Sequence, residues 1–311
     1  RFVRQTSSVR NWITPDGRPG PTGIGGFPAE KGRYLLYVAL TCPWAHRALL
    51  ARKITKLEEL VQVAIVSPIL GDQGWEFRPY PGATEDPLYQ KRYLHQLYTR
   101  DNSNFTGRAT VPVLWDKQRQ CMVNNESTDI LRIFNQAFRA FVPQSPDLYP
   151  KHLKQKINRL NERIYNRLNN GVYLAGFASS QPAYAEAVKD VFKTLDLLED
   201  RLTKPGQYLF GDQLTETDIR LFVTLIRFDL VYYNLFKCNL RQLATYPNLS
   251  AYLKQIYQLP GVAETVNFDH IKAGYYSIKA LNPTGIPPAG PLIEPWLNGD
   301  GACLNNYFNP L

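Results

Sequence analysis

The sequence predicts an α/β domain followed by an all-helical domain. In the first 140 or so residues, short apolar strand-like runs alternate with helical segments. From residue 151 onward no strand pattern competes with the helical periodicity. Between the two halves lie the prolines 143, 146 and 150, which indicate a linker. A chain of 311 residues is long enough for two domains.

The N-terminal part begins with residues 1–33, which are rich in Gly, Pro and charge and are predicted to be an irregular arm. An apolar run at 34–40 predicts the first strand, residues 43–55 a helix, and the β-branched run 61–67 a second strand. A turn-rich insertion over 69–108 follows, and insertions of this length are usually functional.

After the insertion, residues 110–116 predict a third strand that contains Pro112, an edge-strand signal or a special peptide bond. Residues 121–124 predict a fourth strand, and a helix is expected from 127 to about 139. A β-α-β unit followed by β-β-α is the thioredoxin-like arrangement. We therefore expect a thioredoxin-like domain over 34–142.

The C-terminal half predicts an all-helical domain over 151–279 and a Pro/Gly-rich tail over 280–311. Thr215 and Asp218 have the spacing of a capping box. The predicted helices cover about 151–170, 183–203, 216–236, 248–258 and 262–272.

Charge and cysteine content exclude several classes. The net charge is +9, but Lys and Arg are scattered without a basic run, so we expect no nucleic acid partner. No 18-residue apolar stretch indicates a membrane span. We expect a cytoplasmic protein, with an organelle left open because no targeting peptide is visible. The cysteines lie far apart and predict neither a disulfide framework nor a zinc site; they are Cys42, Cys121, Cys238 and Cys303.

Cys42 has the setting of a reactive thiol. The apolar strand runs directly into Thr41-Cys42-Pro43 and then a helix. Unpaired N–H groups and the positive end of the helix dipole favour a thiolate there, and proline suits the first helical turn. The competing interpretation is a buried cysteine at a strand end, and we expect the other three cysteines to be inert.

The histidines are not expected to act in the chemistry. His46 lies one turn after Cys42 and is interpreted as a packing or surface residue, since a thiol at a helix terminus needs no separate base. His95, His152 and His270 have no Cys, Asp or Glu partners at metal-ligand spacing. We therefore predict no metal.

Seven motifs lie along the chain in a fixed order: CPWAHR at 42–47, GWEF at 74–77, GRATVPVLWD at 107–116, NNES at 124–127, VYLAGFA at 172–178, RFDLVYYNLFKCN at 227–239 and IKAGYYSI at 271–278. Together they resemble the xi class of the glutathione transferase superfamily, the glutathionyl-hydroquinone reductases. One position departs from the family, which usually has His where Gly274 precedes Tyr-Tyr here.

The resemblance implies a glutathione site in the first domain. A cis peptide bond at Val111-Pro112 would let the backbone of Val111 pair with glutathione as an added strand. Trp75 and Arg108 are similar to family residues that contact glutathione, although a core aromatic and a surface arginine are the competing interpretations.

Glu126 and Ser127 stand at the predicted start of a helix, where the Ser127 hydroxyl and backbone N–H groups can hold the γ-glutamyl carboxylate. The Glu126 carboxylate can then pair with the α-ammonium group of glutathione. A plain helix cap is the alternative, and both can hold at once.

The resemblance also implies a quinol site built from tyrosines. It points to Tyr173, Tyr232 and Tyr275 as catalytic, with Tyr276 as a rival to Tyr275 for the substrate. A phenol can give a proton to a developing phenolate or enolate oxygen.

The implied activity is reductive removal of glutathione from glutathionyl-hydroquinones through a Cys42–glutathione disulfide, which a second glutathione resolves. Glutathione is then the co-substrate and a homodimer is expected. An omega-type thiol transferase or dehydroascorbate reductase would use the same Cys42 without the tyrosines. A non-enzymatic interaction module is the third alternative.

Overall fold

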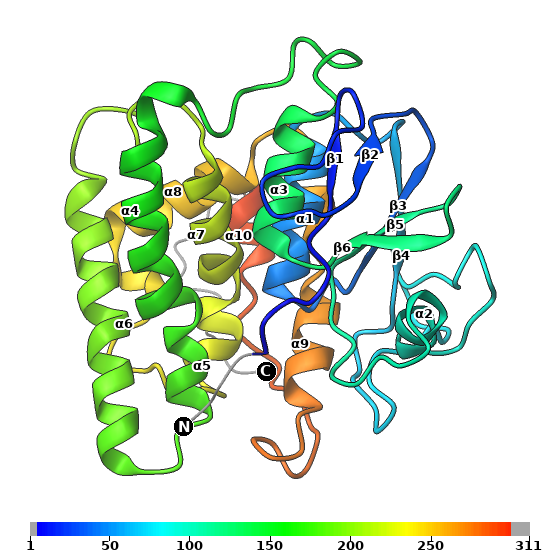
Figure 1. Cartoon of the computed structure of the whole chain (residues 1–311). Helices are drawn as coiled ribbons and strands as arrows, with labels where there is room; N and C mark the ends of the chain where they lie inside the picture. Colours follow the sequence, from blue (N-terminus) through cyan, green and yellow to red (C-terminus); the bar gives the residue numbers. More distant parts are fainter. Residues whose placement is uncertain (1–4, 300–311) are drawn as a thin grey trace. The chain divides into compact units, whose positions relative to one another are not determined.

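The computed structural model describes residues 5–299, which divide into two compact units (Figure 1). The boundary falls inside one helix, between Gly274 and Tyr275. Within this described part no helix is long and apolar enough to cross a bilayer. The first unit comprises residues 5–148 with 265–274, and the second comprises 149–264 with 275–299.

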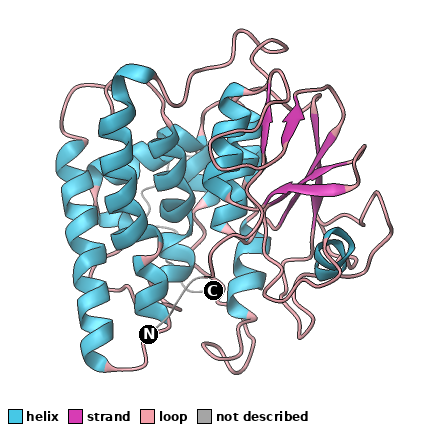
Figure 2. Ribbon diagram, in the orientation of Figure 1, coloured by secondary structure: helices cyan, strands magenta, loops and turns pink. Residues whose placement is uncertain are grey.

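The first unit is built on a four-stranded sheet in the order β4-β3-β5-β6, which Figure 2 shows in magenta. Strand β3 is parallel to β4 and antiparallel to β5, and β5 is antiparallel to β6. This mixed sheet confirms the predicted thioredoxin-like domain. The elements are β1 (Trp12–Thr14), β2 (Gly26–Pro28), β3 (Tyr34–Val38), α1 (Pro43–Ile54), β4 (Val61–Ile65), α2 (His95–Asp101), β5 (Val113–Asp116), β6 (Cys121–Asn124) and α3 (Ser127–Gln136).

The core of this unit forms around β3. Every side chain of Tyr34–Val38 is buried, because β3 lies between β4 and β5 and is covered on both faces. Helices α1 and α3 pack on each other beside the sheet (Figure 1). Just before β3, Arg33 forms a buried ion pair of 2.6 Å with Asp116, which ties the start of β3 to the end of β5.

The N-terminal arm is more ordered than its composition predicts. Residues 12–14 and 26–28 form a two-stranded parallel sheet, and the Trp12 indole N–H donates to the Thr22 hydroxyl at 2.7 Å. The prediction of an irregular arm was wrong here because three-residue strands are too short to show a period. The insertion over 69–108 likewise contains a helix, α2.

The second unit has helices and no strand among its described residues, as the sequence predicts. The predicted helix 216–236 is wrong in detail, because α7 ends at Arg227 and a π-helical turn covers Phe228–Tyr232. The predicted helix 262–272 instead begins at Phe268. The elements are α4 (Lys154–Ile164), α5 (Gly171–Gly176), α6 (Gln181–Arg201), α7 (Glu216–Arg227), α8 (Pro247–Tyr257), α9 (Phe268–Tyr276, shared with the first unit) and α10 (Glu294–Asn298), with 3₁₀ turns at Lys151–Leu153, Leu243–Thr245 and Ala263–Thr265 and a further π-helical turn at Tyr165–Asn169.

The predicted capping box at the start of α7 is confirmed. One Asp218 oxygen accepts from the Thr215 N–H at 2.8 Å and from its hydroxyl at 2.9 Å. The other accepts from the Leu209 N–H at 3.0 Å and from the Tyr252 hydroxyl at 2.8 Å. Asp218 is fully buried, so it joins α7 and α8 inside the unit.

Asp218→Ala is expected to lower the free energy of unfolding by about 3 kcal/mol or more, because it leaves several buried donors without an acceptor. Urea denaturation measures this. The control is Asp200→Ala on the exposed end of α6, which should change stability by less than about 0.5 kcal/mol. A loss no larger than that of the control would contradict the assigned network.

Candidate functional site

Cys42 lies at the N-terminus of α1, directly after the central strand. The turn from β3 is closed by the Cys42 N–H, which donates to the Ala39 carbonyl at 3.0 Å. Cys42 is the N-cap residue: its Sγ accepts from the Ala45 N–H at 3.5 Å, and Pro43 follows at the first helical position. The half-buried thiol therefore has the surroundings that favour a thiolate.

The other cysteines have surroundings of the opposite kind. Burial raises the pKa of Cys121 to about 11 and that of Cys238 to about 12, so both stay protonated at neutral pH. Cys303 lies outside the described residues. Within residues 5–299, no three His, Cys, Asp or Glu side chains gather as metal ligands.

His46 is a buried structural residue, as the sequence analysis expects. Its Nε2 lies 2.8 Å from the Thr265 hydroxyl, and only 1% of the residue is exposed. One residue further on, the buried Arg47 guanidinium lies 4.5 Å from the centre of the Trp44 ring. The contact with Thr265 anchors α1 close to the thiol.

The Val111-Pro112 peptide bond is cis, as predicted. The Cys42 Sγ lies 3.8 Å from the Val111 carbonyl oxygen, so the thiol lies beside the segment that leads into β5. Tyr98 from α2 holds the preceding residue, donating its hydroxyl to the Thr110 carbonyl at 2.7 Å and accepting from the Thr110 N–H at 3.2 Å.

Glu126 is the N-cap of α3, and each of its carboxylate oxygens has a partner. One accepts from the Thr128 N–H at 3.1 Å and the other from the Ser7 hydroxyl at 2.8 Å. Burial alone would raise the pKa of Glu126, but these bonds and the charges of Arg47 and Arg10 outweigh it and lower the pKa. The carboxylate is therefore ionised beside the buried Ser127 at the helix start.

The N-terminal arm contributes residues that sequence reasoning missed. The Val9 carbonyl accepts from the Asn125 N–H at 3.0 Å, which brings Ser7 to Glu126. The Gln5 side-chain oxygen accepts from the Arg108 N–H at 3.0 Å. These partners are more than 100 positions apart, so no local pattern reveals them.

Trp75 and Arg108 lie at the two ends of the insertion in the same unit. Trp75 is half-buried and its carbonyl accepts from the Leu94 N–H at 2.9 Å, while Arg108 is exposed. Their predicted contact with glutathione stays a prediction.

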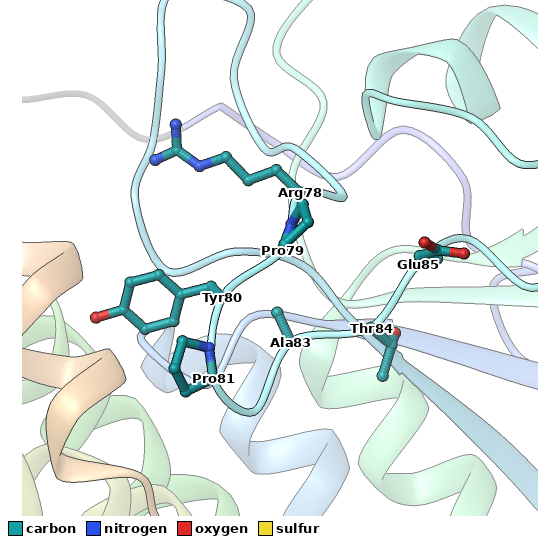
Figure 3. Close-up of a pocket in the computed structure, with 7 residues that line it drawn as sticks. All are labelled: Arg78, Pro79, Tyr80, Pro81, Ala83, Thr84 and Glu85. Atoms are coloured by element: carbon teal, nitrogen blue, oxygen red, sulfur yellow. The ribbon is translucent and has the colours of Figure 1, made fainter.

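The insertion also forms an open pocket of about 520 Å³, lined by residues 78–81 and 83–85 (Figure 3). Figure 3 shows the Tyr80 ring directed away from the loop, and its hydroxyl donates to Asp269 of α9 at 2.8 Å. Neither Trp75 nor Arg108 lines this pocket.

Three tyrosines of the second unit share a hydrogen-bonded cluster. The Tyr275 hydroxyl lies 2.6 Å from that of Tyr173 and 2.9 Å from that of Tyr232. Phe236 packs against all three rings at centroid distances of 5.2 to 5.7 Å. Tyr276 is outside the cluster, since its hydroxyl donates to the Leu230 carbonyl at 3.1 Å.

The tyrosines differ in burial and therefore in how far their pKa values are raised. It raises the pKa of Tyr232 and of Tyr275 well above the ordinary value, and that of Tyr276 to about 12. Tyr173 is the most exposed of the cluster. Tyr232 lies in the π-helical turn after α7, a feature frequent at functional sites.

This fold and this N-cap cysteine define a glutathione transferase. The profile of the glutathione S-transferase N-terminal domain matches residues 41–137, and that of the C-terminal domain matches 181–255.

Proteins of the xi class match nearly the whole chain. The glutathionyl-hydroquinone reductase YqjG of Escherichia coli is 54% identical over 94% of this chain and 89% of its own length. Its glutathione-bound structure has a TM-score of 0.89 over 91% of this chain and 92% of that one.

Two further relatives agree. The glutathionyl-hydroquinone reductase PcpF of Sphingobium chlorophenolicum is 46% identical over 94% of this chain and 90% of its own. The xi glutathione transferase of Phanerochaete chrysosporium is 47% identical, with a TM-score of 0.88 over 94% of this chain and 98% of that one. The chain belongs to the glutathionyl-hydroquinone reductases, the xi class of glutathione transferases.

Ser7→Ala is expected to raise the pKa of Glu126, because one of the bonds that stabilise the carboxylate is lost. Carboxyl-selective NMR titration measures this, with the exposed Ser8→Ala as control. A lowered folded-state pKa contributes stability above the unfolded value of about 4.3, and this is lost as pH falls through the folded pKa. Ser7→Ala should therefore shrink that contribution, and an unchanged Glu126 titration would contradict the assignment.

Proposed function

We propose that this protein reduces glutathionyl-hydroquinones, with Cys42 as the nucleophile. The Cys42 thiolate attacks the glutathionyl sulfur, and the bond between that sulfur and the ring carbon breaks. The electron pair stays with the ring, which gains a proton and leaves as hydroquinone. The position of Cys42 as N-cap of α1, beside the Val111 carbonyl, carries this proposal.

The enzyme is regenerated by a second glutathione. Its thiolate attacks the glutathionyl sulfur of the mixed disulfide, releasing oxidised glutathione and the Cys42 thiolate. The substrate's ring carbon is thereby reduced, and the thioether sulfur of the substrate and the thiol sulfur of the second glutathione are oxidised to one disulfide. Atoms and electrons balance without a metal or another redox group.

The glutathionyl part of the substrate is held, in this proposal, by the residues around the thiol. The backbone of Val111 pairs with the peptide, and the N-terminus of α3 at Ser127 binds the γ-glutamyl carboxylate. Glu126 has an ionised carboxylate suited to the α-ammonium group. Trp75 and Arg108 complete the glutathione contacts.

The tyrosine cluster supplies the proton that the ring needs. An aryl carbon is a poor leaving group, but a keto tautomer of the ring makes its departure feasible. We assign Tyr173 as the proton donor, because it is the most exposed member of the cluster. Tyr275 forms a hydrogen bond with Tyr173 and either stabilises the developing oxygen anion of the substrate or tunes the acidity of Tyr173. Tyr232 forms a hydrogen bond with Tyr275 and so acts through it. Tyr276, which bonds to a backbone carbonyl, is not assigned a catalytic role.

The expected homodimer and the cytoplasmic location stay predictions. Analytical ultracentrifugation of the full chain tests the first.

Cys42→Ser is expected to abolish reduction of glutathionyl-menadiol, because a hydroxyl is hardly ionised and forms no disulfide. Mass spectrometry of the wild type after the first half-reaction should find one glutathione on Cys42. Cys121→Ser is the matched control and should keep the activity, since that thiol stays protonated. Substantial turnover by Cys42→Ser would refute the mechanism.

Tyr173→Phe is expected to slow glutathionyl-hydroquinone reduction on the order of 10²-fold, because one positioned acid is lost. Exchange with a small glutathione mixed disulfide has a sulfur leaving group and should change little. Steady-state kinetics with both substrates measure this, with Tyr149→Phe as control, whose hydroxyl donates to Asn158 at the surface. Equal losses in both reactions would favour an omega-type thiol transferase.

A further inference from the structure

Gly274 lies in the interior of α9, where glycine is otherwise unfavourable. A Cβ atom at this position would lie 2.3 Å from the Thr41 Cγ2, 2.4 Å from the Thr41 Oγ1 and 2.7 Å from the Pro68 carbonyl oxygen. These distances are far shorter than van der Waals contacts, and Pro68 contributes backbone that cannot rotate away. Helix α9 thus approaches the end of β3 so closely that only glycine fits.

The partner of Gly274 is anchored on the same helix. The buried Thr41 donates its hydroxyl to the His270 carbonyl at 2.7 Å. His270 and Gly274 are four residues apart and so lie on one helix face. Thr41 therefore bonds to one turn of α9 at His270 and packs against the next turn at Gly274, where no side chain intervenes.

The insertion fixes α9 from another direction. The His270 Nε2 lies 2.6 Å from the Pro81 carbonyl oxygen, and its ring meets Tyr80 edge to face at a centroid distance of 5.2 Å. The Tyr80 hydroxyl donates to the Asp269 carboxylate at 2.8 Å. The position of α9 against Thr41 is therefore supported by two residues of the loop.

We propose that Gly274 and Thr41 are positioning residues for the thiol of Cys42. Thr41 directly precedes Cys42, so a displacement of Thr41 moves the turn from Ala39 and the contact between Sγ and the Ala45 N–H. The thiolate depends on that N–H and on the helix end, both of which act only at short range. This inference rests on the proposed role of Cys42 as nucleophile.

The same contact shows why a side chain does not fit at position 274 in this protein. The methyl and hydroxyl groups of Thr41 fill the space in which that side chain would begin, and the Pro68 carbonyl oxygen blocks it as well. Glycine at position 274 therefore permits the close approach of Thr41 to α9.

The test is the pH profile of Cys42 alkylation by iodoacetamide, followed by peptide mass spectrometry on the full-length protein. Gly274→Ala should raise the apparent pKa of the thiol by about one unit, which lowers the alkylation rate at neutral pH about tenfold. Gly71→Ala is the control, because a Cβ there meets no atom within 4 Å. An alkylation profile of Gly274→Ala that matches the wild type, even with a lower melting temperature, overturns the proposal.

Substitutions at Thr41 provide arms that do not overpack the site. Thr41→Ser keeps the hydroxyl and should retain the wild-type profile, whereas Thr41→Val keeps the volume, loses the bond to His270 and should shift it. Thr41→Ala combined with Gly274→Ala removes two of the three close contacts and should restore part of the rate lost in Gly274→Ala. Equal profiles for Thr41→Ser and Thr41→Val, or strict additivity in the double variant, overturn the proposal.

Alkylation reports on the thiol directly and needs no turnover. If Cys42→Ser retains reductase activity, the proposed function fails while the alkylation profiles still judge the positioning pair.

Discussion

The burial of β3 between its two neighbours is the constraint on which the site depends. Val38 ends the strand, and the chain leaves the sheet there to reach Cys42. Strand β5 is antiparallel, with Val113 opposite Tyr37, so Val111 emerges at that same end of the sheet. Strand β6 runs back beside β5, with Asn124 opposite Leu114, and brings Glu126 there as well. Strand direction and register alone gather these residues.

The helix starts then determine what this end of the sheet can bind. Helices α1 and α3 both begin here, one capped by a sulfur and the other by a carboxylate. Helix N-termini favour negative charge, so the thiol of Cys42 and the carboxylate of Glu126 are both stabilised as anions. The arm residue Ser7 and the buried Arg47 add to the second effect. Reactivity and recognition therefore come from the same backbone feature.

Local patterns predicted much of this fold. The apolar run before Cys42, the capping box of α7 and the proline after Val111 act over a few residues, and each is visible in the sequence. The contact of Ser7 with Glu126 and that of Thr41 with Gly274 depend on tertiary structure and leave no local trace. The π-helical turn after α7 was also missed, because an extra residue in a turn does not interrupt an apolar pattern.

Tyr275 and Tyr276 are adjacent in the family motif but differ in the contacts of their hydroxyl groups. The motif alone left both open, since adjacent helix residues are about 100° apart and either can face a given side. The hydroxyl of Tyr275 meets two other phenols, whereas that of Tyr276 is used by a backbone carbonyl.

The cluster of three phenols has more hydroxyl hydrogens than hydrogen bonds between its members. Three hydroxyl groups carry three hydrogens, but the two contacts centred on Tyr275 use only two of them. Each phenol donates once, so the two bonds either follow one another in a chain or converge on Tyr275 from both sides. When Tyr232 donates to Tyr275 and Tyr275 donates to Tyr173, the Tyr173 hydrogen is the one that the two bonds within the cluster do not use. Each bond polarises the next, which favours transfer of the Tyr173 proton. The buried end of such a relay would set the acidity of the exposed end.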